Sequence, residues 1–184
     1  MQAVSFDPTG SGRRDHVAFV GVSGQNKKGY MWVIDTTKGT GSDCSQQVEI
    51  GDFSYMFDKS DFEVPTYSNR SFFNIVAGDF DGDGKESILV YTPESYQAGG
   101  CQIQQWDYNG GGLTQRGKSN RLLMRYYNEH PWYDVEDSEG NQRRKLGVSM
   151  AVGDFNGDCV DDLAVLSYCH RLPNDEAKVD YYLP

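Results

Sequence analysis

The stretch VAGDFDGDGKESILVY (residues 76–91) joins an acidic, glycine-rich loop to a continuous apolar run. Two other stretches align with it around the first loop aspartate: AVGDFNGDCVDDLAVL at 151–166 and the more divergent AVSFDPTGSGRRDHVAFV at 3–20. The aligned aspartates, Asp7, Asp79 and Asp154, lie 72 and 75 residues apart. Because nearly constant spacing is typical of repeat architectures, the chain is predicted to contain three related units: 1–71, which is degenerate, 72–146, and 147–184, which is partial.

Each unit is predicted to contain a strand, a nine-residue acidic loop and a second strand. The second strands, at 17–20, 88–91 and 163–166, lack polar alternation, which indicates burial on both faces. Third strands are expected from Tyr30, Cys101 and Ala177, with a hairpin turn at the NGGG that follows Tyr108. Less regular fourth strands are expected at 46–50 and 122–127.

Three or four antiparallel strands per unit, covered on both faces, predict an all-β fold of β-propeller-like blades. About two and a half to three blades make an incomplete propeller, since a closed one takes at least ~4. We therefore expect the remaining contacts to come from further blades of a longer chain, from self-assembly or from other proteins, unless the blades form an open stack with protected edges.

The composition excludes several other classes of protein. The 184 residues carry a formal charge of −10, which opposes binding to nucleic acid, and no apolar run is long enough for a membrane span. The four cysteines form no C-x-x-C pair and the three histidines are scattered, so a zinc site is not indicated. Three complete disulfide pairings remain open. Cys159 and Cys169 would lie ~30 Å apart if one strand joins them.

The second loop, 79–87, has the composition of a hard-metal site. Carboxylates stand at its positions 1, 3 and 5, and glycines at positions 4 and 6 permit a sharp turn. Three carboxylates ~5 Å apart repel by about 3 kcal/mol per pair at an effective dielectric of ~20, so a folded loop favours a cation. Calcium accepts 6 to 8 oxygens in flexible geometry and is the expected ion. The candidate ligands are Asp79, Asp81, Asp83, the carbonyl of Lys85 and, at position 9, Ser87, with water or Glu86 to complete the shell.

The third loop, 154–162, offers the most complete ligand set: Asp154, Asn156, Asp158, the carbonyl of Val160, and Asp162. The first loop, 7–15, keeps only Asp7 and Asp15 as carboxylates and is interpreted as vestigial. In the ungapped alignment Asp15 matches Ser87 and Asp162. One alternative is a set of Asp-Gly turns that bind nothing. An EF-hand is disfavoured, because position 12 is valine in both acidic copies and an extended apolar run follows where a helix would be needed.

The stretches VAGDFDGDGKESILVY and AVGDFNGDCVDDLAVL resemble FG-GAP or VCBS-type repeats, the blade units of integrin alpha-subunit propellers and of many secreted microbial proteins. The resemblance covers about 54 of the 184 residues. It implies that each loop joins the first two strands of a blade and holds calcium. The implied ligands are Asp79, Asp81, Asp83, Asp154, Asn156, Asp158 and Asp162. Cys159 departs from the pattern, since the second copy has Gly84 there, and a positive φ at that position would be costly for cysteine.

No catalytic constellation is recognisable. The sequence GVSMA at 147–151 weakly resembles a serine nucleophile motif, but it enters a strand and a metal loop rather than a helix. We therefore expect a non-catalytic, calcium-binding module of an extracellular or cell-surface protein that mediates adhesion, protein or carbohydrate binding, or assembly. The alternative is a set of accessory blades in a secreted polysaccharide-degrading enzyme or toxin subunit. The aromatic segment 125–134 is a candidate patch for a protein or glycan ligand, although packing between blades would also explain it.

Overall fold

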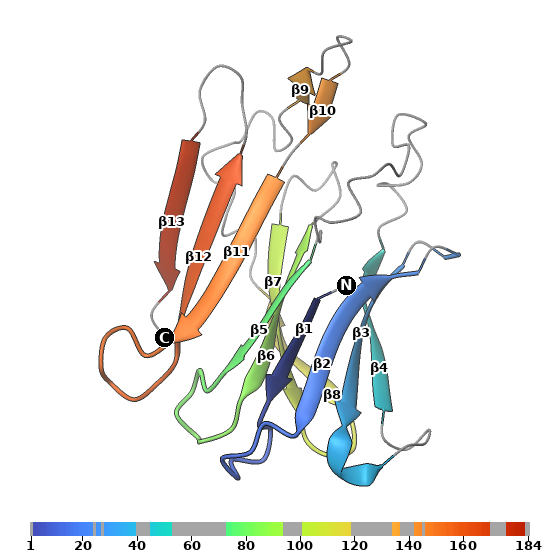
Figure 1. Ribbon diagram of the computed structural model, residues 1–184, viewed down its shortest axis with the longest axis vertical. Helices are drawn as coiled ribbons and strands as arrows, with labels where there is room; N and C mark the ends of the chain where they lie inside the picture. The colour runs from blue at the N-terminus through green and yellow to red at the C-terminus, as the bar shows by residue number, and fades with distance from the viewer. Residues whose placement is uncertain are drawn as a thin grey trace.

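The computed structural model describes residues 2–23, 25–26, 28–39, 45–52, 73–93, 101–118, 134–136, 142–144, 146–169 and 176–182 (Figure 1). The first sheet contains β1 (Gln2–Phe6), β2 (His16–Val22), β3 (Lys28–Asp35) and β4 (Ser45–Asp52). The second contains β5 (Asn74–Gly78), β6 (Ser87–Pro93), β7 (Cys101–Tyr108) and β8 (Leu113–Lys118). The third contains β11 (Leu146–Gly153), β12 (Asp162–Cys169) and β13 (Glu176–Tyr182). A small fourth sheet pairs β9 (Asp134–Glu136) with β10 (Gln142–Arg144).

The three larger sheets are antiparallel meanders whose strands follow sequence order. Apart from one 3₁₀ turn at Thr36–Lys38, the regular structure of the described residues is all β, as predicted, and none of the sheets closes on itself. Figure 1 shows the three sheets side by side, with their acidic loops at the same end of the molecule. Within the described ranges, no helix is long and apolar enough to cross a membrane.

The fourth strand of the second sheet differs from the prediction. The turn after Tyr108, closed by the Asn109 N–H on the Gly112 carbonyl, leads directly into β8 at Leu113–Lys118. The predicted fourth strand at 122–127 lies outside the described residues. Three consecutive glycines, one of them Gly110 with φ of 77°, allow this tight return, so the chain needs no longer connection before the fourth strand.

Two apolar cores hold the sheets together. The first lies between the first and second sheets and consists of Phe6, Ala18, Val20, Met31, Val33, Ile50, Phe73, Ile75, Ala77, Ile88, Val90, Trp106 and Tyr108. The second lies between the second and third sheets and consists of Leu89, Tyr91, Ile103, Met150, Leu163 and Val165. Alternate residues of β6 enter the two cores, which explains why 88–91 is continuously apolar.

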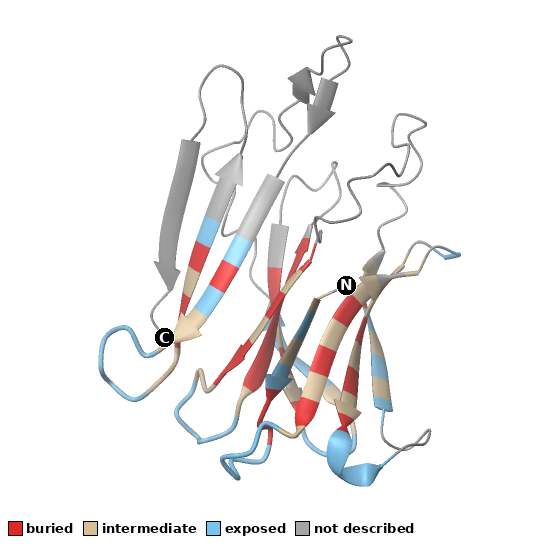
Figure 2. Ribbon diagram, viewed as in Figure 1, coloured by how far each residue is buried: buried red, intermediate tan, exposed pale blue. Residues whose placement is uncertain are grey.

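Among the described residues, burial on both faces is clearest in β6 of the second sheet, where 88–91 are all buried (Figure 2). In β2, Ala18 and Val20 are fully buried while Phe19 is only partly covered. In β12, Val165 is fully buried but Leu166 is 40% exposed. The prediction of burial on both faces is therefore confirmed for 88–91 and wrong for 17–20 and 163–166, because each outer sheet packs against another described sheet on one face only.

Candidate metal-binding loops and the contacts between them

The first aspartate of each loop organises the backbone around it. In the second loop, the Asp79 carboxylate accepts the N–H groups of Gly82, Asp83 and Gly84 at 2.8, 3.1 and 2.8 Å. In the third loop, the Asp154 carboxylate accepts those of Gly157, Asp158 and Cys159 at 2.6, 3.1 and 2.9 Å. In the first loop, Asp7 accepts those of Thr9, Gly12 and Arg13 at 3.0, 2.5 and 3.1 Å. The second and third loops thus share one hydrogen-bond pattern, and all three loops have positive φ at positions 4 and 6.

In the second loop this conformation brings the predicted carboxylates together. One ligand oxygen from each of Asp79, Asp81 and Asp83 lies within 4.8 Å of the others. Among the described residues this is the only such group of three histidine, cysteine or acidic side chains. Asp81 and Asp83 are exposed and Asp79 is partly buried, so an ion could reach the group from solvent.

Arg116 on β8 contacts the edge of this acidic group. Its guanidinium forms ion pairs with Asp81 and, at 2.9 Å from Nε, with Asp107. The Ser87 hydroxyl, a predicted ligand, donates to Asp107 at 2.7 Å. The hydrogen bond from Arg116 lowers the pKa of Asp81, and the same bond raises the pKa of Arg116. Arg116 therefore supplies positive charge to a carboxylate that a metal would also use.

Replacing Arg116 with glutamine is expected to strengthen divalent-ion binding at the second loop by several-fold. The substitution removes a cation that competes for Asp81, while its amide can still bond Asp107. Isothermal titration with calcium would measure the change, and Lys28→Gln, which removes an equal charge from the first sheet, is the control. An unchanged affinity in the Arg116 variant would show that the guanidinium does not compete with the ion.

The predicted ligands of the third loop converge less closely than those of the second, although the third loop has the more complete ligand set in the sequence. Asp162 is 1% exposed, and its Oδ2 accepts the Phe155 N–H at 2.9 Å. Its Oδ1 has no hydrogen-bond partner among the described residues. Asn156 donates its amide to Asp158 at 3.0 Å. Hydrogen bonds led by the Cys159 N–H lower the pKa of Asp154, which favours its ionised form.

Cys159 has a φ of 69°, and it is the only described non-glycine residue with positive φ. The corresponding glycines, Gly12 and Gly84, have φ of 77° and 82°. Because φ is positive here, cysteine costs roughly 1 kcal/mol or more relative to glycine, as expected from the sequence. The cysteine is exposed and unpaired.

The first loop is one residue longer than the alignment indicates. Phe6 pairs with His16, whereas Gly78 pairs with Ser87 and Gly153 with Asp162. His16, not Asp15, therefore occupies the ninth position, and the predicted equivalence of Asp15 with Ser87 and Asp162 is wrong. The extra residue follows position 6, because all three loops have positive φ at positions 4 and 6.

The carboxylate of Asp7 is surrounded by donors of its own loop. Besides the backbone N–H groups, the Thr9 hydroxyl donates to it at 2.7 Å and the Ser11 hydroxyl lies at 3.4 Å. Burial acts to raise the pKa of Asp7, but these hydrogen bonds together outweigh burial and hold the pKa well below its usual range. Hydroxyl donors stand where the second loop has carboxylates, which supports the vestigial interpretation.

A repeated hydrogen-bonded pair connects the first and second loops to the sheet that follows each of them. Glu86, the residue just before β6, accepts the Asp7 N–H at 2.6 Å through its carboxylate and donates its own N–H to the Asp7 carbonyl at 2.8 Å. Asp161, just before β12, does the same to Asp79, with both distances 2.8 Å. We call this arrangement the acidic clasp. The sequence comparison did not identify it, although the shared signal, an acidic residue at position 8, was present.

The clasps are accompanied by close backbone approach. An added Cβ at Gly10 would lie 2.9 Å from the Gly84 carbonyl oxygen, and one at Gly82 would lie 3.1 Å from a methyl of Val160. Position 4 of one loop therefore packs against position 6 or 7 of the next. The glycines predicted to permit the turn therefore also permit one loop to pack closely against the next.

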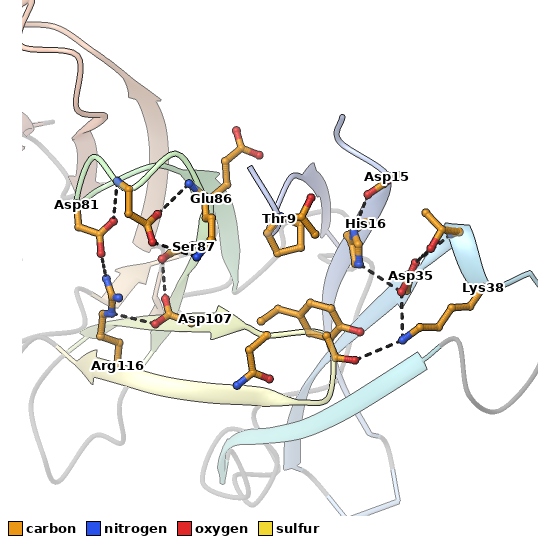
Figure 3. A pocket seen from close by; sticks show the side chains of 17 residues that line it. Thr9, Asp15, His16, Asp35, Lys38, Asp81, Glu86, Ser87, Asp107 and Arg116 are labelled. Atoms are coloured by element: carbon orange, nitrogen blue, oxygen red, sulfur yellow. Dashed lines mark hydrogen bonds and ion pairs between the residues drawn. The ribbon is translucent and has the colours of Figure 1, made fainter. Parts of the chain in front are cut away.

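A polar pocket of about 700 Å³ opens between the first and second loops (Figure 3). On one side Arg116, Asp81, Asp107 and Ser87 form the network described above. On the other, the buried His16 ring lies between Asp15 at 2.7 Å and Asp35 at 3.5 Å. Sequence reasoning missed His16, Asp35, Asp107 and Arg116, because they come from four different strands with no shared spacing.

Asp35 contributes to the stability of this pocket in a pH-dependent way. The Thr37 hydroxyl is the main cause that lowers its pKa from 3.8 to about 2, with help from Lys38. Since the folded pKa is depressed, this stabilisation is fully present above about pH 4 and is lost as the pH falls toward 2. Asp35→Asn is therefore expected to destabilise the chain at neutral pH and to flatten its acid dependence in that window. Urea unfolding across the window, with Glu49→Gln as control, measures this; parallel pH profiles would contradict it.

No family model matches the chain, and comparison with curated proteins finds no match. The predicted aromatic ligand patch at 125–134 lies almost wholly outside the described residues.

Proposed function

We propose that this chain is a non-catalytic, calcium-binding repeat module of an extracellular or cell-surface protein, in which the three larger sheets act as propeller-type blades. The observation that carries the proposal is the convergence of Asp79, Asp81 and Asp83 within 4.8 Å on a loop whose backbone is already organised. Three hard oxygen donors, with no histidine or cysteine grouped with them among the described residues, favour calcium or magnesium over zinc or copper. Calcium is preferred because the loop supplies an irregular, partly exposed set of oxygens and not a strict octahedron.

A second observation supports the same chemistry in the third loop. Asp162 is buried with one carboxylate oxygen lacking a partner in the described part of the chain, and such an oxygen is costly unless a donor or cation satisfies it. Asp162 was predicted as a ligand from its position alone. A calcium ion held by this carboxylate would offset the cost of its burial.

Metal binding would stabilise the contacts between neighbouring sheets. Asp79 belongs to the proposed site through its carboxylate and to an acidic clasp through its backbone. An ion that fixes the loop would therefore also fix the group to which Asp161 binds. The bound ion would hold neighbouring blades in register, and the module would present its loops as a rigid surface for a protein or glycan ligand.

Calcium titration of the purified chain tests this proposal. We expect stoichiometric heat on calcium addition, a higher melting midpoint with calcium than with chelator, and loss of one site in Asp81→Asn/Asp83→Asn and of another in Asp158→Asn. Glu49→Gln removes an exposed carboxylate from β4 and is expected to keep both sites. Identical melts with calcium and chelator, together with no binding heat, would refute calcium binding. A screen of glycans and matrix proteins tests the ligand part separately.

A further inference from the structure

The outward face of the third sheet lacks the cover that its counterpart has. By strand register Leu166 on β12 corresponds to Tyr91 on β6, yet Leu166 is 40% exposed and Tyr91 only 4%. Phe155 in the third loop is 54% exposed, whereas its counterpart Phe80 packs against the second core. The third sheet therefore presents the apolar groups that, on the second sheet, contact a following sheet.

The same end of the molecule carries one half of an acidic clasp. The backbone N–H and carbonyl of Asp7 are held by Glu86, and those of Asp79 by Asp161. Asp154 occupies the same loop position, and no acidic residue among those described binds its backbone. In addition, an added Cβ at Gly157 would meet nothing within 4 Å, whereas Gly10 and Gly82 each meet the next loop.

The first sheet carries the other half. Asp15 stands directly before His16, just as Glu86 stands before Ser87 and Asp161 before Asp162, once the one-residue insertion is taken into account. Its side chain is 29% exposed and contacts His16, and its carbonyl accepts the Thr36 N–H. Nothing among the described residues binds the Asp15 N–H, so the group that would donate to an aspartate carbonyl remains available.

The outward face of the first sheet is also apolar. Phe19 and Trp32 stack at 5.2 Å between ring centroids, and neither is fully covered. Val17 and Ile34 lie beside them by strand pairing, and their counterparts on the second sheet, Ile88 and Trp106, are buried in the first core. By this register Ile34, and not Trp32, takes the place of Trp106.

We propose that the first sheet of a second copy of this chain docks on the third sheet of the first copy, with Asp15 completing the acidic clasp at Asp154. The apolar faces would pack as the two internal interfaces do. The contact is head-to-tail, so it generates a closed ring if the rotation between copies permits and an open chain if it does not. It requires no metal, and it can fail while calcium binding stands. Each copy carries −10 charges, so moderate salt is expected to strengthen the association.

Sedimentation velocity of the full chain over a range of concentrations tests the contact with two single substitutions. Leu166→Arg places a charge on the outward face of the third sheet. Ala3→Arg does so on the first sheet, where Ala3 is exposed and pairs with Phe19. We expect the unsubstituted chain to self-associate and each variant to raise the dissociation constant about tenfold or more. Thr114→Arg, an exposed position on the edge strand β8, is the control and is expected to associate normally.

Mixing the two variants distinguishes the proposed contact from a symmetric one. The Leu166 variant keeps an intact first sheet and the Ala3 variant an intact third sheet, so an equal mixture is expected to form a heterodimer that neither variant forms alone. Circular dichroism verifies that both variants are folded. A single-chain mass for the unsubstituted protein at every concentration would overturn the proposal, and so would association that neither substitution weakens or a mixture without heterodimer.

Discussion

Gly78→Ala is expected to separate the third sheet from the second. A Cβ at Gly78 would lie 2.8 Å from the Asp161 carboxylate and closer still to a methyl of Val152. Both neighbours belong to the interface: Asp161 forms the acidic clasp and Val152 packs against the second core. Because the clasp holds the Asp161 side chain and the second core holds Val152, neither has much room to move, and we expect a loss of about 2 to 4 kcal/mol in the free energy of unfolding.

Gly153→Ala is the matched control, since Gly153 has the same position in the third sheet. Its added Cβ would lie 3.4 Å from the exposed Phe155 ring, an ordinary contact, and the expected change is below about 1 kcal/mol. Guanidinium unfolding measures both variants, and hydrogen exchange is expected to rise within 146–169 only for Gly78→Ala. Equal midpoints for the two alanine variants would show that the sheets are not in close contact at Gly78.

The sequence predicts the parts of the fold that depend on local chemistry. Alternation, turn glycines and the acidic motif locate the three loops and the strands beside them, because these signals act within about ten residues. The positive φ of Cys159 follows from alignment with Gly84 for the same reason. The meander order is also local, since short hairpins place consecutive strands next to each other.

What the sequence does not predict depends on neighbours distant in the chain. Burial of Leu166 and Tyr91 differs because Tyr91 faces the third sheet, whereas no described sheet packs on the face that carries Leu166, although both residues follow the same motif. The insertion in the first loop becomes visible only through the pairing of Phe6 with His16. Likewise, the ion pair of Arg116 with Asp81 joins residues 35 apart, and no spacing rule indicates it.

The acidic clasp shows that an acidic residue placed like a metal ligand in the sequence can instead hold two sheets together. Glu86 and Asp161 belong to loops rich in carboxylates, where sequence alone does not distinguish an additional acidic residue from one more metal ligand. In the fold each turns toward the preceding loop and satisfies a backbone N–H there. Acidic residues of these loops therefore divide into a converging group, represented by Asp79, Asp81 and Asp83, and a group that joins sheets.

Asp162→Asn is expected to have opposite effects in chelator and in calcium. In chelator the buried Asp162 has one carboxylate oxygen without a partner among the described residues, so removing its charge is expected to stabilise the chain by about 1 to 3 kcal/mol. With excess calcium the unsubstituted chain gains binding energy that the variant lacks, so the order of stability is expected to reverse. Thermal and urea unfolding under both conditions measure this crossing.

Asp154→Asn in the same loop tests whether the effect of Asp162→Asn arises from the burial of Asp162 or from the loss of any loop charge. Asp154 is exposed and its carboxylate accepts three backbone N–H groups, so its neutralisation weakens charge-assisted hydrogen bonds and is expected to destabilise the chain even in chelator. Two Asp→Asn substitutions eight residues apart would then change the stability of the chain in chelator in opposite directions, while both reduce calcium binding. If both variants were destabilised equally in chelator, Asp162 would have to be satisfied by groups other than a metal, and the proposed ion at the third loop would lose its main support.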